Sequence, residues 1–269
     1  MKKLFSVILC IVILALPVCA VSSFAAGESF VVLGDSIAEG VGSDDPAVDS
    51  YAAVVAEKNG YELTNIARAG STSKNLMDKV LNDEEARKAI KNADIIEISI
   101  GGNDFLLNNM LLTVAGAMAG NFSRVDEILV TFRENFDTTI TEIRSLNPDA
   151  LVIVQTLYNP MGGTQFFDAY EAALERLNAV YSDYLKENPG AYIITDVHGA
   201  FHGKEGLIYK DNIHPSPAGH AVIAETLMKT ISARKTDASI PQTGGTVSYA
   251  LLALAFCSAA AAAVTVKKK

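Results

Sequence analysis

Four short polar clusters in the chain combine the residue types that nucleophilic chemistry at a carbonyl needs. A serine hydroxyl becomes a good nucleophile only when a neighbouring base, usually histidine, takes its proton. The histidine needs a carboxylate that fixes its tautomer and stabilises the imidazolium. The reaction also needs hydrogen-bond donors where the oxyanion develops. The chain offers Ser36, His214 and Asp211, with Asn103 and Gly70 as donors.

The candidate nucleophile, Ser36, directly follows an apolar run and stands in the sequence Gly34-Asp35-Ser36. A serine at such a place is more commonly a helix cap or part of a turn, so the position alone is weak evidence. The nucleophile elbow G-x-S-x-G is absent, because Ala38 holds its last position. The nucleophile prediction therefore depends on the other clusters.

The candidate base and its carboxylate are only three residues apart, at Asp211 and His214. On a tight loop this spacing lets the carboxylate reach back to the imidazole. Pro215 restricts His214 to extended backbone, which stiffens the loop. The alternative is an ordinary structural Asp-x-x-His loop.

The candidate oxyanion donors are the side chain of Asn103 and the backbone N–H of Gly70. Asn103 follows two glycines, which allow close backbone approach, and its amide offers two N–H donors. Gly70 stands in a Gly- and Ser-rich stretch that is equally compatible with a simple strand-to-helix turn.

The elements that must position these residues alternate between strand and helix. This alternation predicts a parallel sheet with helices on both faces, and a site beyond the carboxyl ends of the strands. The polar clusters at 34–36, 101–104 and 211–214 are each expected to follow a strand, as a single site requires. We expect strands at 30–33, 62–66, 95–100, 150–154 and 192–195. We expect helices at 50–58, 73–92 with a candidate break near Asn82 and Asp83, 105–118, 123–146, 166–186 and 216–232.

Taken together, the clusters resemble the sequence blocks of the SGNH or GDSL hydrolases. Gly34-Asp35-Ser36 resembles the first block, Gly70 the glycine of the second, Gly102-Asn103-Asp104 the third, and Asp211 with His214 the last. The resemblance covers Phe30 to about Leu227, with Ile37 where leucine is usual. It implies a flavodoxin-like three-layer α/β/α sandwich with a five-stranded parallel sheet.

The same resemblance implies ester hydrolysis without a metal or other cofactor. Ser36 would be the nucleophile, His214 the base and Asp211 the group that orients it. The oxyanion hole would consist of the N–H groups of Ser36 and Gly70 and the Asn103 amide. The substrates would be those of an esterase, lipase or lysophospholipase. An acetylesterase acting on acetylated glycans, and a non-catalytic surface-binding module of the same fold, are the alternatives.

The N-terminal residues 1–26 are typical of a secretory signal peptide. Lys2 and Lys3 precede an uncharged apolar run from Leu4 to Val21, and small residues follow. The cleavage position is left open between Ala20 and the region of Ala26. An uncleaved membrane anchor is the alternative.

The C-terminus resembles a sortase sorting signal of Gram-positive bacteria. It has an uncharged apolar run of 20 residues, 247–266, long enough to span a membrane, and then three lysines. The pentapeptide 240–244 precedes the run and starts with Ile240 where leucine is usual. The resemblance implies sortase cleavage between Thr243 and Gly244 and transfer to peptidoglycan, from a precursor transiently in the membrane. A plain tail anchor is the alternative.

Between these ends we expect one hydrolase domain at 27–232, and a linker with the sorting motif at 233–243. The three cysteines all lie in the two ends, so the domain has neither a disulfide nor a thiol catalyst. Five of the 22 basic residues also lie there, which leaves 17 against 31 acidic residues and a net charge of −14. This charge argues against nucleic-acid binding. We expect a monomer that acts on a small-molecule, glycan or lipid ester.

The remaining histidines do not form a metal-ligand cluster that the sequence supports. We interpret His198 and His202 as solvated loop residues, with lining of the cleft as the alternative, and His220 as a packing residue of the last helix. The apolar, methionine-containing segment 105–118 follows the third block. It is either a helix packed on the core or a lid or wall for an acyl chain.

Overall fold

The computed structural model describes residues 27–108 and 110–239, and its centre is one parallel sheet. The strand order is β2-β1-β3-β4-β5, and each neighbouring pair is parallel. This confirms the predicted fold class. The strands are β1 (Ser29–Gly34), β2 (Glu62–Asn65), β3 (Ile95–Ser99), β4 (Leu151–Gln155) and β5 (Ile193–Thr195).

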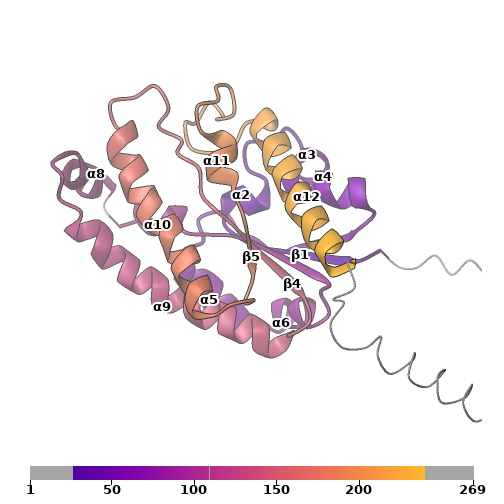
Figure 1. Ribbon diagram of the computed structural model, residues 1–269. Coiled ribbons are helices and arrows are strands. Elements are labelled where there is room, and N and C mark those ends of the chain that lie inside the picture. The colour runs from indigo at the N-terminus through magenta and orange to yellow at the C-terminus, as the bar shows by residue number, and fades with distance from the viewer. Residues whose placement is uncertain (1–26, 109, 240–269) are drawn as a thin grey trace, which may run out of the picture.

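Helices cover both faces of the sheet (Figure 1). On one face α4 packs against α12, and α11 and α3 lie beside them. On the other face α9 packs against α5, α6, α10 and α8. The helices are α2 (Ser36–Glu39), α3 (Pro46–Asp49), α4 (Tyr51–Asn59), α5 (Ser73–Asn82), α6 (Glu84–Lys91), α7 (Gly102–Leu106), α8 (Met110–Met118), α9 (Ser123–Leu146), α10 (Phe167–Glu187), α11 (Val197–Phe201) and α12 (Pro217–Ser239).

The burial of the strands follows from this layering. Every residue of β3 is buried, and β1 and β4 are buried apart from their first residues. A strand covered on both faces is mostly apolar, which explains the apolar runs of these strands. The buried Glu97 and Ser99 interrupt the run in β3. The edge strands β2 and β5 are less buried. The carboxyl ends of the central strands are therefore held rigidly.

An aromatic cluster fills the space between the sheet and the helices α9 and α10. Phe136 contacts the rings of Tyr181, Tyr184 and Tyr192 with centroids 5.1 to 5.8 Å apart. The buried Tyr181 hydroxyl donates to the carbonyl of Ile100, at the end of β3. The cluster thus connects the helical layer to the strand that leads into the third polar cluster.

Helix ends agree closely with the sequence-based expectations. Ser50 caps α4 and Gly60 ends it in the left-handed conformation. Asp83 separates α5 from α6, where the sequence predicted a break. The Ser216 hydroxyl accepts from the N–H of Gly219, as expected for the residue before α12.

Three differences from the expectations concern helices. The segment 105–118 is not one helix, because α7 ends at Leu106 and α8 begins at Met110. The last helix continues to Ser239, seven residues beyond its expected end. The short helices α2, α3 and α11 were not predicted, and each is capped by an aspartate, Asp35, Asp45 or Asp196.

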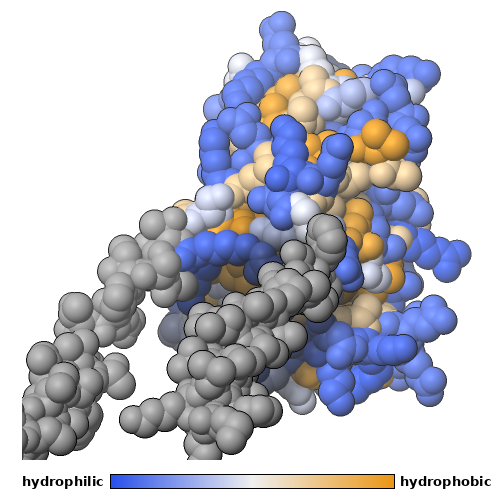
Figure 2. Space-filling model, turned by 90° about the vertical axis from the view of Figure 1, so that its right-hand side faces the viewer, coloured by the Kyte–Doolittle hydropathy of each residue, from blue (hydrophilic) through white to orange (hydrophobic). Residues whose placement is uncertain are grey.

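The surface over α12, α4 and α3 is largely hydrophilic, with separate hydrophobic spots (Figure 2). Within residues 27–108 and 110–239, no helix is long and apolar enough to cross a membrane. The predicted signal peptide, the pentapeptide and the apolar run before the terminal lysines lie outside the described residues.

Candidate active site

The predicted nucleophile lies at the carboxyl end of the central strand β1. Ser36 is the first residue of the short helix α2, and Asp35 caps this helix by accepting from the N–H of Ile37 at 3.0 Å. Gly34 has a φ of +139°, and a Cβ there would lie 1.9 Å from the carbonyl oxygen of Ser99. Only glycine therefore allows β1 to turn sharply against β3 and present Ser36 at the edge of the sheet.

Ser36, His214 and Asp211 form a continuous hydrogen-bonded chain. The Oγ of Ser36 lies 2.8 Å from Nε2 of His214, and Nδ1 of His214 lies 2.7 Å from Oδ2 of Asp211. The other oxygen of Asp211 accepts from the backbone N–H groups of Ile213 and His214, both at 3.0 Å. The three-residue spacing thus closes a tight loop, and the structure brings the three predicted residues together.

Close backbone approach brings the histidine loop to the serine. Gly42 has a φ of +98°, and a Cβ there would lie 2.1 Å from the carbonyl oxygen of Pro215. The hydroxyl of Tyr158 donates to the carbonyl of Ile213 at 2.8 Å and holds the loop from the other side. Sequence reasoning missed both residues. The signal for Gly42 was the Gly-rich stretch after Ser36, whereas nothing marked Tyr158.

The predicted oxyanion donors Gly70 and Asn103 follow β2 and β3, the two strands that flank β1 in the sheet. Asn103 lies in the first turn of α7, and its amide donates to the carbonyl of Ser71 at 2.9 Å. Since the amide carries two N–H groups, this bond orients it and leaves the second for a ligand. Gly70 lies exposed in the loop after β2 with a φ of +79°. No hydrogen bond of its N–H is found among the described residues.

A buried hydrogen-bond network ties the two donor loops together. Asp104 accepts from the N–H of Ser73 at 2.9 Å and from its hydroxyl at 2.6 Å. Asn135 of α9 donates to the same hydroxyl at 3.0 Å. Sequence reasoning missed Ser73 and Asn135. An asparagine on the apolar face of α9, between Phe132 and Phe136, was the available signal.

Two buried carboxyl groups lie beneath the site. Burial, with the nearby Asp104 charge, raises the pKa of Asp35 to about 7, although backbone N–H groups such as that of Ile37 lower it. Burial also raises the pKa of Glu97 to about 8, although the hydroxyl of Tyr51 donates to it at 2.6 Å. The other Glu97 oxygen has no partner among the described residues. Both groups thus favour their neutral forms.

The pKa of Asp211, the carboxylate hydrogen-bonded to His214, is shifted in the opposite direction. Partial burial acts to raise the pKa of Asp211, but the His214 ring and the N–H groups of His214 and Ile213 hold it below its ordinary value. Asp211 therefore stays ionised at neutral pH, as a group that orients a histidine must.

The other histidines divide into three environments. His220 is fully buried and stacks on Tyr51, which confirms its packing role. His202 is exposed, as expected for a solvated residue. His198 corrects the interpretation as a solvated residue, because it lies half-buried on α11 with its Nε2 2.8 Å from Glu171. Within the described residues, no group of three or more potential ligands can hold a metal ion.

Helix α8 is not packed on the core through its leucines. Leu111 is 78% exposed and Leu112 is 53% exposed, and Leu107 just before the helix is also exposed. The buried side of α8 consists of Thr113 and Ala117, which face α10. This result contradicts the core-helix alternative for the leucine pair.

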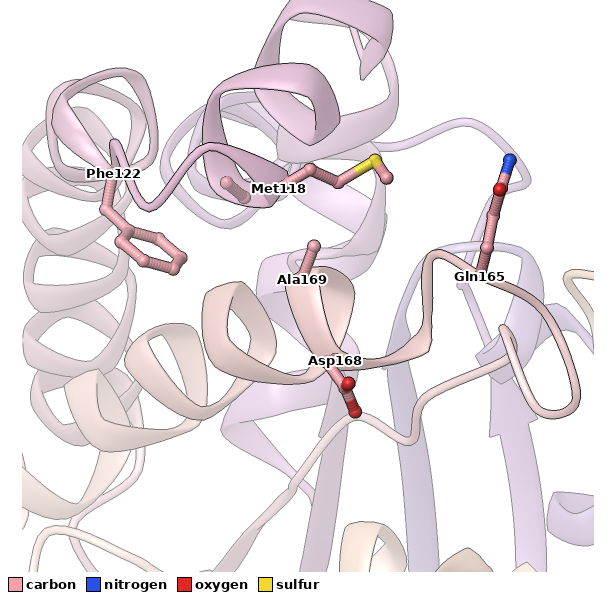
Figure 3. Close-up of a pocket in the computed structure, with 6 residues that line it drawn as sticks. Met118, Phe122, Gln165, Asp168 and Ala169 are labelled. Atoms are coloured by element: carbon pink, nitrogen blue, oxygen red, sulfur yellow. The ribbon is translucent and has the colours of Figure 1, made fainter.

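A hollow of about 280 Å³ lies between the end of α8 and the start of α10. Met118, Phe122, Gln165 and Ala169 border it (Figure 3). A second, apolar and more enclosed hollow lies deeper between the same helices and reaches Phe105 of α7. Phe105 is two residues from Asn103, so apolar space begins beside the donor helix.

Comparison with known proteins agrees with this architecture. The pattern of the GDSL-like Lipase/Acylhydrolase family matches residues 32–222. The uncharacterised protein YpmR of Bacillus subtilis (strain 168) is 30% identical over 219 residues, which cover 74% of this chain and 79% of that protein. The spore germination lipase LipC of Bacillus licheniformis is 26% identical over 214 residues, 74% of this chain and 93% of that protein.

Among solved structures, the lipase Lip_vut3 from a goat rumen metagenome is similar in fold. Its TM-score is 0.61 at 22% identity, covering 75% of this chain and 96% of that one. The parallel sheet covered by helices on both faces is the fold that the two structures share. The chain belongs to the GDSL-like lipase and acylhydrolase family, and it is a carboxylic ester hydrolase.

Proposed function

We propose that the protein is a secreted, cell-wall-attached serine esterase that works through an acyl-enzyme on Ser36. The observation that carries this proposal is the hydrogen-bonded chain from Ser36 through His214 to Asp211, with distances of 2.8 and 2.7 Å. It supplies nucleophile, base and orienting carboxylate in one geometry. These residues are the ones that the sequence blocks predicted.

In the proposed reaction, His214 takes the hydroxyl proton as Ser36 Oγ forms a bond to the ester carbonyl carbon. The carbon–oxygen bond to the alcohol then breaks, and His214 gives that proton to the departing alcohol. Water repeats the sequence on the acyl-enzyme and releases the acid, with Ser36 regenerated. The ionised Asp211 stabilises the imidazolium in both halves.

The oxyanion is proposed to be held by three N–H groups. Ser36 begins α2, so its N–H has no acceptor inside the helix and is available to a ligand. Asn103 contributes the amide N–H that Ser71 does not use, and Gly70 contributes its backbone N–H. Preorganised donors of this kind are each worth about 10²–10³ in kcat.

On the acyl side, the exposed leucines of α8 are proposed to form a wall or lid for an apolar acyl chain. They follow the helix that carries Asn103 within a few residues. Leu107, Leu111 and Leu112 lose contact with water when an acyl chain covers them. Each buried methylene of such a chain contributes about 0.8 kcal/mol.

Attachment to the cell wall is proposed from the sequence of the two chain ends. The positively charged, apolar N-terminus supports export, and the pentapeptide before a 20-residue apolar run and three lysines supports sortase processing. Thr243→Ala in the native host should release the protein into the medium or leave it in the membrane fraction. Unchanged recovery in peptidoglycan digests would contradict the attachment proposal.

The catalytic proposal is tested by Ser36→Ala. We expect hydrolysis of a p-nitrophenyl ester to fall by several orders of magnitude, with the melting temperature retained and labelling by a fluorophosphonate probe lost. Asn59→Ala, on the far end of α4, serves as the control. Activity above about a tenth of the wild-type rate in Ser36→Ala would remove Ser36 as the nucleophile.

A further inference from the structure

A cavity of about 610 Å³ borders the loop that carries Asp211 and His214. Its wall includes Asn212, which stands between these two residues, and Ile208 and Tyr209 just before them. The opposite walls come from the segment between β4 and α10 and from α11 with its following loop. The volume falls within the range of about 300–1,000 Å³ that is usual for small-molecule sites.

The polar side of this cavity is built around Glu171. Its side chain is only 14% exposed, and its two oxygens lie 2.8 Å from Nε2 of His198 and 2.8 Å from the amide nitrogen of Asn159. His202 lies further out, with Nδ1 3.8 Å from the same carboxylate. A carboxylate, two imidazoles and an amide therefore line one space, and hydrogen bonds fix Glu171, His198 and Asn159 relative to one another.

The remaining walls are ring faces and apolar side chains. Phe167 and Phe201 both line the cavity, and Tyr158 stacks on Phe201 with ring centroids 4.3 Å apart. The same Tyr158 holds the carbonyl of Ile213 through its hydroxyl. The stacked rings of Phe201 and Tyr158 therefore connect the wall of the cavity to the loop that positions His214.

The charges of the cavity select among ligand classes. Two carboxylates, Glu171 and Glu205, stand against one ammonium, Lys204. This balance disfavours a phosphate or another anion, and the charged groups disfavour a hydrocarbon chain. Hydroxyl groups both donate and accept, so they match a mixture of carboxylate, imidazole and amide. The C–H faces of a polyol match the phenylalanine rings.

We infer that this cavity binds the alcohol part of the substrate, and that this part is a neutral polyol such as a sugar unit or a glycerol headgroup. The inference rests on the proposed function, in which His214 returns its proton to the departing alcohol. The alcohol must therefore lie on the His214 side of the ester. Asn212, which lines the cavity, is two residues from His214 in the sequence. Glu171 and His202 bind its hydroxyl groups.

The test compares esters that share one acyl group and differ in the alcohol. We would measure kcat and KM for 1-butyrylglycerol, a methyl glucoside 6-butyrate and ethyl butyrate. The wild-type protein should prefer at least one polyol ester over ethyl butyrate by tenfold or more in kcat/KM. The preferred polyol ester distinguishes a glycerol headgroup from a sugar.

Two variants probe the cavity itself. His202→Ala changes an exposed side chain, so the fold should survive, and Glu171→Gln removes the central charge. In both, the ratio of kcat/KM for the preferred polyol ester to that for ethyl butyrate should fall at least fivefold, mainly through KM. Glu225→Gln, an exposed carboxylate of α12, is the matched control and should keep the wild-type ratio.

Several results would overturn the inference. One is a wild-type protein that prefers neither polyol ester over ethyl butyrate. Another is a His202→Ala variant that keeps the wild-type ratio of kcat/KM for the two kinds of ester. The third is a control variant, Glu225→Gln, in which this ratio falls as much as in the cavity variants. If Glu171→Gln fails to fold, competitive inhibition of the wild-type protein by methyl glucoside or glycerol, and its weakening in His202→Ala, decides the question. Failure of the proposed function has a different signature, because Ser36→Ala would then keep its activity on all three esters.

Discussion

Asp104 receives both the backbone N–H and the hydroxyl of Ser73, at 2.9 and 2.6 Å, and so joins the loop after β2 to the loop after β3. Burial raises the pKa of Asp104, although the two bonds from Ser73 lower it. Asn103, the residue before Asp104, donates to the carbonyl of Ser71 and so also joins the two loops. The positions of two proposed oxyanion donors, Asn103 and Gly70, therefore depend on one buried serine.

Ser73→Ala is expected to lower kcat about tenfold with a small change in KM. The substitution leaves Asp104 and Asn135 each without the hydroxyl that they contact, so the donor loops shift. A buried polar group left unsatisfied costs about 1–3 kcal/mol of unfolding free energy. Steady-state kinetics and denaturant unfolding measure the two effects.

The conservative variant Ser73→Thr keeps the hydroxyl and should restore much of kcat. The control is Ser182→Ala, at a half-buried position of α10, whose hydroxyl bonds to the backbone of its own helix. If Ser73→Ala loses unfolding free energy and keeps kcat, Ser73 is a structural residue only.

Activity should fall as the pH drops below neutrality. Hydrogen bonds from His214 and its loop hold the pKa of Asp211 below its ordinary value despite partial burial, so Asp211 stays ionised through this range. The loss of activity in acid is therefore attributed to the general base that accepts the proton of Ser36, and not to Asp211. A pH–rate profile of kcat/KM that is flat from pH 8 to 4 would contradict catalysis by a general base.

Asp211→Asn should lower kcat by about 10²–10⁴. The amide retains the shape of the side chain but has no charge to stabilise the imidazolium, and it favours the wrong tautomer of His214. Asp44→Asn, an exposed aspartate in the loop before α3, is the matched control. A loss of less than fivefold in Asp211→Asn would assign the orienting role elsewhere.

The elements and the pair of Asp211 and His214 were predictable because each has a local signal. The contact of Ser36 with His214 spans 178 positions, and only the resemblance of the sequence blocks predicted it. Apolar runs mark β1, β3 and β4 because these strands are buried on both faces. Asp211 and His214 are three residues apart and lie in one tight loop, so the local sequence is enough to predict their contact.

The residues that sequence reasoning missed act across long separations. Asn135 reaches Ser73 over 62 positions, and Tyr158 reaches Ile213 over 55. No spacing rule relates such pairs, because the packing of α9 and of the loop after β4 decides which side chains meet. The same reason explains the segment 105–118, whose composition suits a buried helix. The packing of α8 against α9 and α10 determines that Leu111 and Leu112 face outward.

The double change Leu111→Ser, Leu112→Ser tests the acyl-wall proposal. Both side chains are exposed, so the melting temperature should change by less than about 2 °C, since surface substitutions usually cost within about 0.5 kcal/mol. The preference for octanoyl over acetyl p-nitrophenyl esters should fall at least fivefold. Val48→Ser, an exposed apolar residue of α3 on the other side of the sheet, should keep that preference.

Two outcomes would contradict the acyl-wall proposal. One is a wild-type protein that itself prefers the acetyl ester, which would make an acetylated glycan the better substrate. The other is a double variant that loses stability and affects both esters alike.

The buried carboxyl of Glu97 should make the folded protein less stable as the pH rises. Burial raises its pKa from 4.5 in the unfolded chain to about 8, and the Tyr51 hydroxyl lowers it only in part. The folded protein therefore binds this proton more tightly than the unfolded chain does. The stability is fully present below about pH 4.5 and is lost as the pH approaches and passes 8. Each pKa unit corresponds to about 1.4 kcal/mol, so the effect is on the order of a few kcal/mol.

Glu97→Gln removes this titration while preserving an oxygen for Tyr51. The unfolding free energy of the variant should therefore change less between pH 5 and 9 than that of the wild-type protein. The wild-type curve also contains the general effect of the negative net charge, which is −9 for the full chain and which the variant shares to within one charge. The difference between the two curves isolates Glu97, measured by urea unfolding at five pH values. Parallel curves from pH 5 to 9 would mean that Glu97 has the same pKa in both states, and that its burial among β3 and α4 carries no linked proton.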